Sequence, residues 1–268
     1  GGRNAASVYN AAFQKRLFWD GRARSLEEQA SGPLFHPAEM AMPDAQTIEH
    51  RLSGEVAYAP LFAAAFGDET ISFARVVKAI AAFERTLITP DTPYDRFVRG
   101  EAGALSQVQL RGMALFQEIG CITCHAGPNF SEASVFSTGS GFRLFPAIET
   151  PRIDVYQLRQ DKGAARVAER GLFRVPSLRN VALTGPWFHN GAVNDLSEVV
   201  RIMVTSQVGA LLSEDPRQEP QIRWDMQAAR LEINRPRVLT ERDIGDIVAF
   251  LHALTSDRLA KANTGAPP

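Results

Sequence analysis

The 268-residue sequence has only two cysteines, a net charge of only −1 and no long apolar run. Its balanced charge gives no overall attraction to nucleic acid or to an anionic membrane surface, so neither is an expected partner. Its apolar runs fall short of the roughly 18 to 20 residues of a membrane-spanning helix, so no membrane span is expected. The chain begins at Gly1 without a methionine or an apolar leader, and we expect it to be processed or truncated there.

Both cysteines belong to one motif, Cys121-Ile122-Thr123-Cys124-His125. Two thiols on about one helical turn can add to the two vinyl groups of a haem, and the adjacent imidazole then becomes an axial ligand of the iron. Three alternatives stay open: a redox-active thiol pair, a zinc site that would need further ligands, and a plain disulfide that gives His125 no role. The motif therefore predicts one covalent haem c on this chain. A periplasmic location follows, because bacteria attach such haems outside the cytoplasm.

Helical periodicity dominates the sequence, and alternating strand patterns are scarce, so the predicted fold class is all-α with long irregular loops. Helices are predicted over 72–87 with Phe83 on the buried stripe, from Ser106 into the haem motif, over 196–207, and from a capping box at Thr240. With 45% hydrophobic residues, the chain can bury a substantial core.

Two further segments are interpreted from composition. The stretch from Asp215 to Arg237 is rich in charge and proline and is expected to be a surface insertion. The tail from Lys261 to Pro268 is expected to fray.

From Asn4 to about Leu254 the chain resembles the bacterial di-haem cytochrome c peroxidase and MauG superfamily. The segments that carry the resemblance are Phe18–Ala23, Leu26–Ala30, Glu39–Met40, Cys121–His125, Phe173–Asn180 and Phe188–Gly191. The resemblance implies two cytochrome c-like haem domains: an apparently incomplete N-terminal domain at residues 1–100, whose haem is peroxidatic, and an electron-relay domain at residues 101–260. The family's first Cys-x-x-Cys-His motif is missing here. The chain is therefore expected to be part of a protein that holds two haems.

The resemblance also implies roles for single residues. Met203 matches the second axial ligand of the relay haem, opposite His125, although a methionine can also simply pack in a core. Glu39 matches an acid–base residue that moves a proton between the two oxygens of peroxide, and Gln29 matches its polar neighbour. Both could instead be solvated helix residues. Trp19 matches the aromatic residue between the haems, which is compatible with an anchoring role.

Further implied sites are ionic. Asn4, with the carbonyl oxygens of Thr184 and Pro186, matches a calcium site, and oxygen ligands suit a hard cation. Arg174 and Arg179 match residues that pair with haem propionates, although either could form a surface ion pair.

Three functions follow from these expectations. The first is a periplasmic peroxidase that reduces hydrogen peroxide with electrons from a small cytochrome c or cupredoxin. The second is a MauG-like enzyme that oxidises a protein substrate through Trp19, although MauG is expected to have a tyrosine where this chain has Met203. The third is a non-enzymatic c-type electron carrier. The chain could also form a homodimer.

Overall fold

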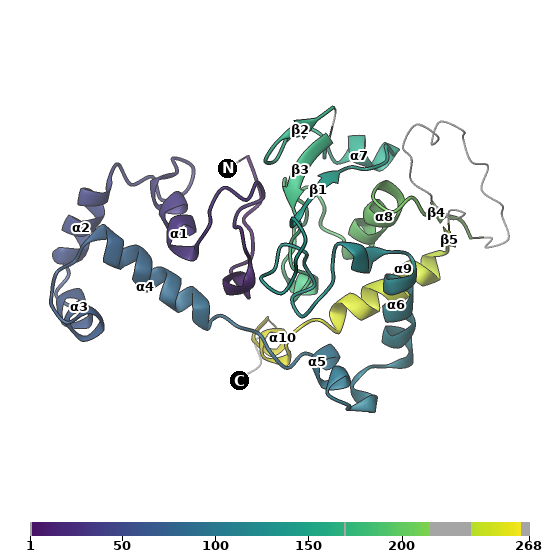
Figure 1. Cartoon of the computed structure of the whole chain (residues 1–268), viewed down its shortest axis with the longest axis horizontal. Coiled ribbons are helices and arrows are strands. Elements are labelled where there is room, and N and C mark those ends of the chain that lie inside the picture. Colours follow the sequence, from purple (N-terminus) through teal and green to yellow (C-terminus); the bar gives the residue numbers. More distant parts are fainter. Residues whose placement is uncertain (1, 169, 215–236, 264–268) are drawn as a thin grey trace.

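The computed structural model describes residues 2–168, 170–214 and 237–263, and it is mostly helical, as predicted (Figure 1). Nearly all of the expected insertion at 215–237 and the end of the expected frayed tail lie outside the described residues. The helices are α1 (Leu26–Phe35), α2 (Ala45–Ser53), α3 (Tyr58–Phe66), α4 (Phe73–Thr86), α5 (Pro93–Val98), α6 (Gln107–Glu118), α7 (Pro151–Val155), α8 (Leu196–Ser206), α9 (Glu241–His252) and α10 (Asp257–Asn263).

The four predicted helices are confirmed as α4, α6, α8 and α9, and side-chain caps explain where most of them begin. The Ser106 hydroxyl accepts from the Gln109 backbone N–H at the start of α6, while the Gln109 side chain accepts from the Ser106 N–H. Thr240 and Asp243 form the same reciprocal pair at the start of α9. These boundaries are therefore fixed by residues three positions apart.

The predicted buried stripe of α4 is wrong at Phe83, whose side chain is 64% exposed. The buried positions of this helix are Val76, Val77, Ala81 and Glu84. At about 100° per residue, Ala81 and Glu84 lie within about 40° of Val77 around the helix axis, whereas Phe83 lies about 120° away. The stripe thus continues through a small residue and a carboxylate, and the large apolar side chain faces solvent.

A small antiparallel sheet is the part of the fold that the all-α prediction missed. Its order is β1-β3-β2, formed by β1 (Phe142–Phe145), β3 (Arg170–Arg174) and β2 (Arg166–Val167). A separate parallel pair joins β4 (Leu211–Leu212) to β5 (Val238–Leu239). These strands are two to five residues long, too short to show a clear alternating pattern.

Helices α1–α4 lie on one side of the molecule, and the sheet with α6–α9 lies on the other, with the N-terminal segment between them (Figure 1). α1–α4 share a cluster that includes Ile48 and Phe62. The largest cluster is built around α6, α8 and α9, and Tyr94 of α5 packs against it. Helix α5 therefore contacts the second group although it precedes the predicted domain boundary at residue 100, and that boundary stays a prediction.

Helices α6 and α9 cross closely at Gly112. A Cβ atom at this position would lie 1.8 Å from the backbone oxygen of Asp246, so only glycine fits the crossing. The haem motif follows directly at the end of α6. Across the part of the chain that the structure describes, no helix is both long enough and apolar enough to cross a bilayer.

Candidate haem-binding site

The two cysteines share a single turn after α6. Gly120 adopts a left-handed conformation with φ of 96°, and the short 3-10 helix Cys121–Thr123 follows. The His125 backbone N–H donates to the Cys121 carbonyl at 3.0 Å, so the turn carries both thiols and the imidazole together. Burial and the neighbouring Cys124 raise the pKa of the Cys121 thiol to about 12. A redox-active pair needs a lowered thiol pKa, so this shift disfavours the thioredoxin-like alternative.

The His125 ring is oriented by a backbone carbonyl. Nδ1 lies 3.0 Å from the Phe130 oxygen and donates to it. Burial lowers the imidazole pKa to about 4, so the ring is neutral near pH 7. A neutral ring that donates from Nδ1 keeps the lone pair of Nε2 free, which is the arrangement of a histidine that ligates a metal.

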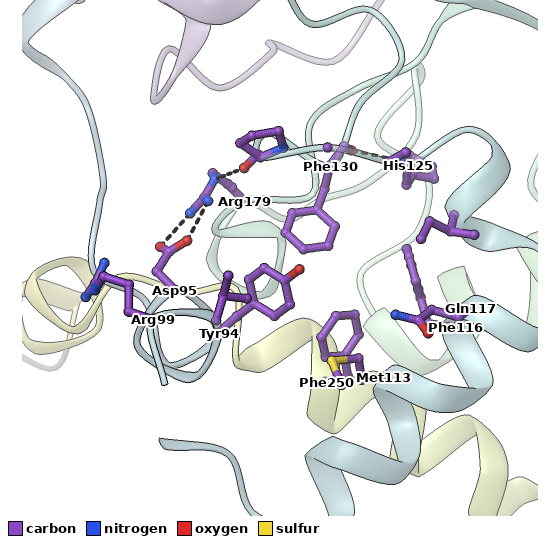
Figure 2. Close-up of a pocket in the computed structure, with 15 residues that line it drawn as sticks. Tyr94, Asp95, Arg99, Met113, Phe116, Gln117, His125, Phe130, Arg179 and Phe250 are labelled. Atoms are coloured by element: carbon purple, nitrogen blue, oxygen red, sulfur yellow. Dashed lines mark hydrogen bonds and ion pairs between the residues drawn. The ribbon is translucent and has the colours of Figure 1, made fainter. Parts of the chain in front are cut away.

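A cavity of about 420 Å³ borders the His125 ring (Figure 2). Four aromatic rings contribute to its walls, those of Tyr94, Phe116, Phe130 and Phe250. The Tyr94 and Phe130 rings meet edge to face with centroids 4.9 Å apart. The described lining residues do not include either cysteine or Met203. The cavity therefore lies against the imidazole without reaching the predicted second ligand.

Met203 lies in a different apolar cluster, which includes Phe173, Phe188 and Trp19. α8 places Met203 there, and Ile202 beside it in sequence is fully buried. No contact joins Met203 to His125 among the described residues, and their pairing on one iron stays a prediction.

Arg174 is a buried cation with only neutral partners among the described residues. It is 5% exposed, its Nε donates to the Phe18 carbonyl at 2.9 Å, and its Nη1 donates to Gln14 Oε1 at 3.1 Å. Burial lowers its pKa to about 10. A buried charge is costly without an anion beside it. The environment of Arg174 therefore fits a residue that pairs with an anionic group such as a haem propionate.

Arg179 differs because it already has a carboxylate partner. Its guanidinium makes two hydrogen bonds to Asp95, at 2.9 and 2.7 Å, and its Nε donates to the Pro128 carbonyl at 2.6 Å (Figure 2). Burial would raise the pKa of Asp95, but the hydrogen bonds and charge of Arg179 lower it to about 2. A propionate role for Arg179 would require this ion pair to be shared.

Trp19 makes hydrogen bonds to the backbone through both its indole N–H and its own carbonyl. Its indole N–H donates to the Asn4 carbonyl at 2.9 Å, and its own carbonyl accepts from the Arg174 N–H at 2.9 Å. Next to it lies His189, which is 3% exposed and stacks on Phe173 with centroids 4.3 Å apart. Within the described residues, His189 Nε2 is buried without a hydrogen-bond partner, and burial lowers the ring pKa to about 4. His189 thus lies beside Trp19, whose carbonyl accepts from Arg174. In the sequence, only the Phe188–Gly191 match pointed to His189.

Of the three predicted calcium ligands, Asn4 and Pro186 are in contact, and within the described chain Thr184 is not joined to them by a hydrogen bond. The Asn4 side-chain N–H donates to the Pro186 carbonyl at 2.6 Å, and the Asn4 backbone N–H donates to the His189 carbonyl at 2.7 Å. A cation would need the amide oxygen of Asn4 to face the Pro186 oxygen, which a half-turn of the amide provides. Among the described residues, no hydrogen bond brings the Thr184 carbonyl into this contact. Those residues also contain no cluster of three or more His, Cys, Asp or Glu side chains, so a cation here would depend on neutral oxygens.

The N-terminal residues also tie separate loops together through charge. Arg3 hydrogen-bonds Asp20 at 2.6 Å and Asp161 at 2.8 Å. With Asn4, it forms what we call the N-terminal clip, the contacts of Arg3 and Asn4 with the loops around Trp19.

Gln29 and Glu39 belong to α1 and to the turn after it. Gln29 is half-buried on α1, and Glu39 is half-exposed in the turn that follows α1, with its side chain 47% exposed. Glu39 pairs with the basic side chain of His36, whose Nδ1 lies 3.6 Å from Oε1. The structure therefore presents Glu39 at the surface of the described chain.

Together these residues fit a c-type haem: a two-thiol turn, a histidine with a free Nε2, and a buried arginine that has no anion in the described chain. A haem is needed for all three predicted functions: the peroxidase, the MauG-like enzyme and the electron carrier.

Comparison with known proteins supports the same chemistry. Residues 1–103 match the family model described as di-haem cytochrome c peroxidase. The chain is 35% identical to the cytochrome c551 peroxidase of Pseudomonas aeruginosa over 261 residues, which cover 95% of this chain and 65% of that protein. It is 30% identical to the methylamine utilization protein MauG of Methylophilus methylotrophus, covering 96% of this chain and 69% of MauG. The chain thus spans less than two thirds of the Pseudomonas relative.

Among solved structures, a MauG-like protein associated with microbial copper homeostasis superposes with a TM-score of 0.75. It is 30% identical in sequence, and the match covers 97% of this chain and 77% of that one. The likeness therefore extends over nearly the whole chain.

Proposed function

This chain belongs to the di-haem cytochrome c peroxidase and MauG family, and from that premise we propose that it forms part of a periplasmic enzyme that reduces hydrogen peroxide to water. The observation that carries the proposal is the Cys121–His125 turn, in which the Phe130 carbonyl holds the proton on His125 Nδ1 and leaves Nε2 free. A bound c-type haem would supply the one-electron chemistry. The overall reaction consumes one hydrogen peroxide, two protons and two electrons, and releases two waters.

Four residues of this chain would bind the relay haem. Cys121 and Cys124 would hold the relay haem covalently, and His125 and Met203 would ligate its iron. Two protein ligands would limit reorganisation during electron transfer, and a thioether ligand would raise the potential. A small cytochrome c or cupredoxin would donate electrons here.

Charged and polar residues would bind the haem propionates and a calcium ion. Arg174 would neutralise a propionate, because its present partners are all neutral. Arg179 would do so only by sharing Asp95. Asn4, with the carbonyl oxygens of Thr184 and Pro186, would bind a calcium ion and so hold the loop behind Trp19.

The second haem of the complete protein would be served by the N-terminal residues. Glu39 would accept a proton from the near oxygen of bound peroxide and return it to the leaving oxygen. Gln29 would hydrogen-bond the peroxide or its water. Trp19 would lie on the electron path between the two centres.

The experiment is a steady-state assay of the complete protein with a reduced small cytochrome and peroxide. A pyridine haemochrome count should give one covalent haem on this chain and two on the complete protein. Two covalent haems on these 268 residues alone, or no peroxide-dependent oxidation of the cytochrome, would refute the proposal.

A MauG-like reaction is the second candidate, and the TM-score of 0.75 to a MauG-like protein favours keeping it. In that reaction a protein partner would lose electrons through Trp19. Peroxide-dependent oxidation of an added protein, without oxidation of the reduced cytochrome, would support it. A single haem in the complete protein would instead support an electron carrier.

A further inference from the structure

We propose that His36 is a proton-relay and positioning residue for Glu39, delivering protons from solvent to its carboxylate. The inference rests on the acid–base role proposed above for Glu39. It concerns a step which that role leaves open, because Glu39 only moves a proton from one peroxide oxygen to the other. Two more protons must arrive from solvent for each peroxide reduced to two waters.

The backbone of His36 builds the turn that presents Glu39. α1 ends at Phe35, and the His36 N–H closes the helix by donating to the Gly32 carbonyl at 3.1 Å. The His36 carbonyl then accepts from two backbone N–H groups, those of Glu39 at 2.9 Å and Ala41 at 3.1 Å. The position of Glu39 relative to His36 is therefore fixed by hydrogen bonds within the turn.

The His36 side chain meets the same turn through one ring nitrogen. Nδ1 lies 3.2 Å from the Ala38 backbone N–H donor and 3.6 Å from Glu39 Oε1. Because a backbone N–H can only donate, Nδ1 accepts in this arrangement, and a neutral ring then carries its proton on Nε2. Both side chains are about half exposed, at 49% for His36 and 47% for Glu39, so water reaches the ring.

These contacts define two states with a simple proton balance. In the first state, neutral His36 accepts the Ala38 N–H. In the second state, Nδ1 has taken a proton from water, loses the Ala38 bond and faces the Glu39 carboxylate as a cation. Transfer of that proton from Nδ1 to Oε1 restores the neutral ring and leaves Glu39 protonated. No bond between heavy atoms changes, and the proton lost by water is the proton gained by Glu39.

Most of the other charged groups on α1 and near α2 have partners elsewhere. On α1, Glu27 pairs with Arg85 and Glu28 accepts from the Arg24 N–H. Before and within α2, Asp44 caps Thr47, Glu49 accepts from the Phe73 N–H, and Arg51 contacts Met42 Sδ. His50 completes the titratable groups of α2. Among the described residues, His36 and Glu39 have only each other as ion-pair partners.

The test compares His36→Asn with His50→Asn in the complete protein with both haems. An asparagine at position 36 can still accept the Ala38 N–H through its side-chain oxygen, as in an Asx turn, but it does not titrate. We expect kcat with peroxide to fall about tenfold at neutral pH, less than the 10²- to 10⁴-fold typical of losing the acid–base group itself. The pH profile of kcat should lose one ionisation, and added imidazole should restore much of the rate. His50→Asn should leave both unchanged.

The outcomes separate this inference from the function on which it rests. If His36→Asn keeps the parent's kcat and pH profile while Glu39→Gln is inactive, the relay is overturned and the acid–base role stands. If Glu39→Gln is as active as the parent, the acid–base role itself fails. In the double variant, the His36 change should cost nothing more once Glu39 is Gln. A further tenfold loss would show that His36 acts independently of Glu39 and would also overturn the relay.

Discussion

Replacing Gly112 with alanine should lower the free energy of unfolding, because this residue lies where α6 crosses α9. The added Cβ would lie 1.8 Å from the Asp246 carbonyl oxygen and 2.5 Å from its carbon, whereas ordinary contacts begin at 3.4 Å. The helices would have to separate by about 1.6 Å. Overpacking typically costs about 1 to 3 kcal/mol, and the upper end applies because the obstructing atoms are helical backbone that cannot rotate away. Alanine's higher helix propensity returns about 1 kcal/mol, so the net loss is about 2 kcal/mol.

The chain offers a matched control in Gly245, which is in the middle of α9. A Cβ there meets no atom within 4 Å, so Gly245→Ala should gain up to about 1 kcal/mol from helix propensity alone. Urea denaturation of the haem-loaded protein, followed by far-UV circular dichroism, measures both variants. If Gly112→Ala is as stable as Gly245→Ala, α6 and α9 do not cross as closely as described, and the reasoning fails.

Three further substitutions test the candidate site. Arg174→Met should lower the midpoint potential of the relay haem in a spectroelectrochemical titration, because losing a buried positive charge favours the ferric form; an unchanged potential would mean that this cation does not face the haem. Met203→His should keep a six-coordinate spectrum and lower the potential markedly, since thioether ligation raises it; an unchanged spectrum and potential would indicate another ligand. Trp19→Phe should preserve both haem spectra but slow oxidation of the relay haem. Stopped-flow mixing of the half-reduced complete protein with peroxide measures that rate. A rate equal to the parent's would mean that Trp19 only packs.

Features that depend on neighbouring residues could be predicted from the sequence, and those that depend on distant contacts could not. The capping boxes at Ser106 and Thr240 each involve residues three positions apart, so their helices were predicted correctly. The environment of Arg174 was beyond prediction, because its partners Phe18 and Gln14 are 156 and 160 residues away. The missed sheet has the same cause, since β1 and β3 pair across a long loop and neither strand shows its partner in its own pattern.

The N-terminal clip contains a protease site that can be used to measure how the loops around Trp19 move. The peptide bond between Arg3 and Asn4 is a trypsin site whose two residues bind three different loops: Arg3 holds Asp20 and Asp161, and Asn4 holds Pro186. A protease can open that bond only when Arg3 leaves its two carboxylates. The rate of cleavage after Arg3 therefore reports how often these loops separate, with or without a chromophore.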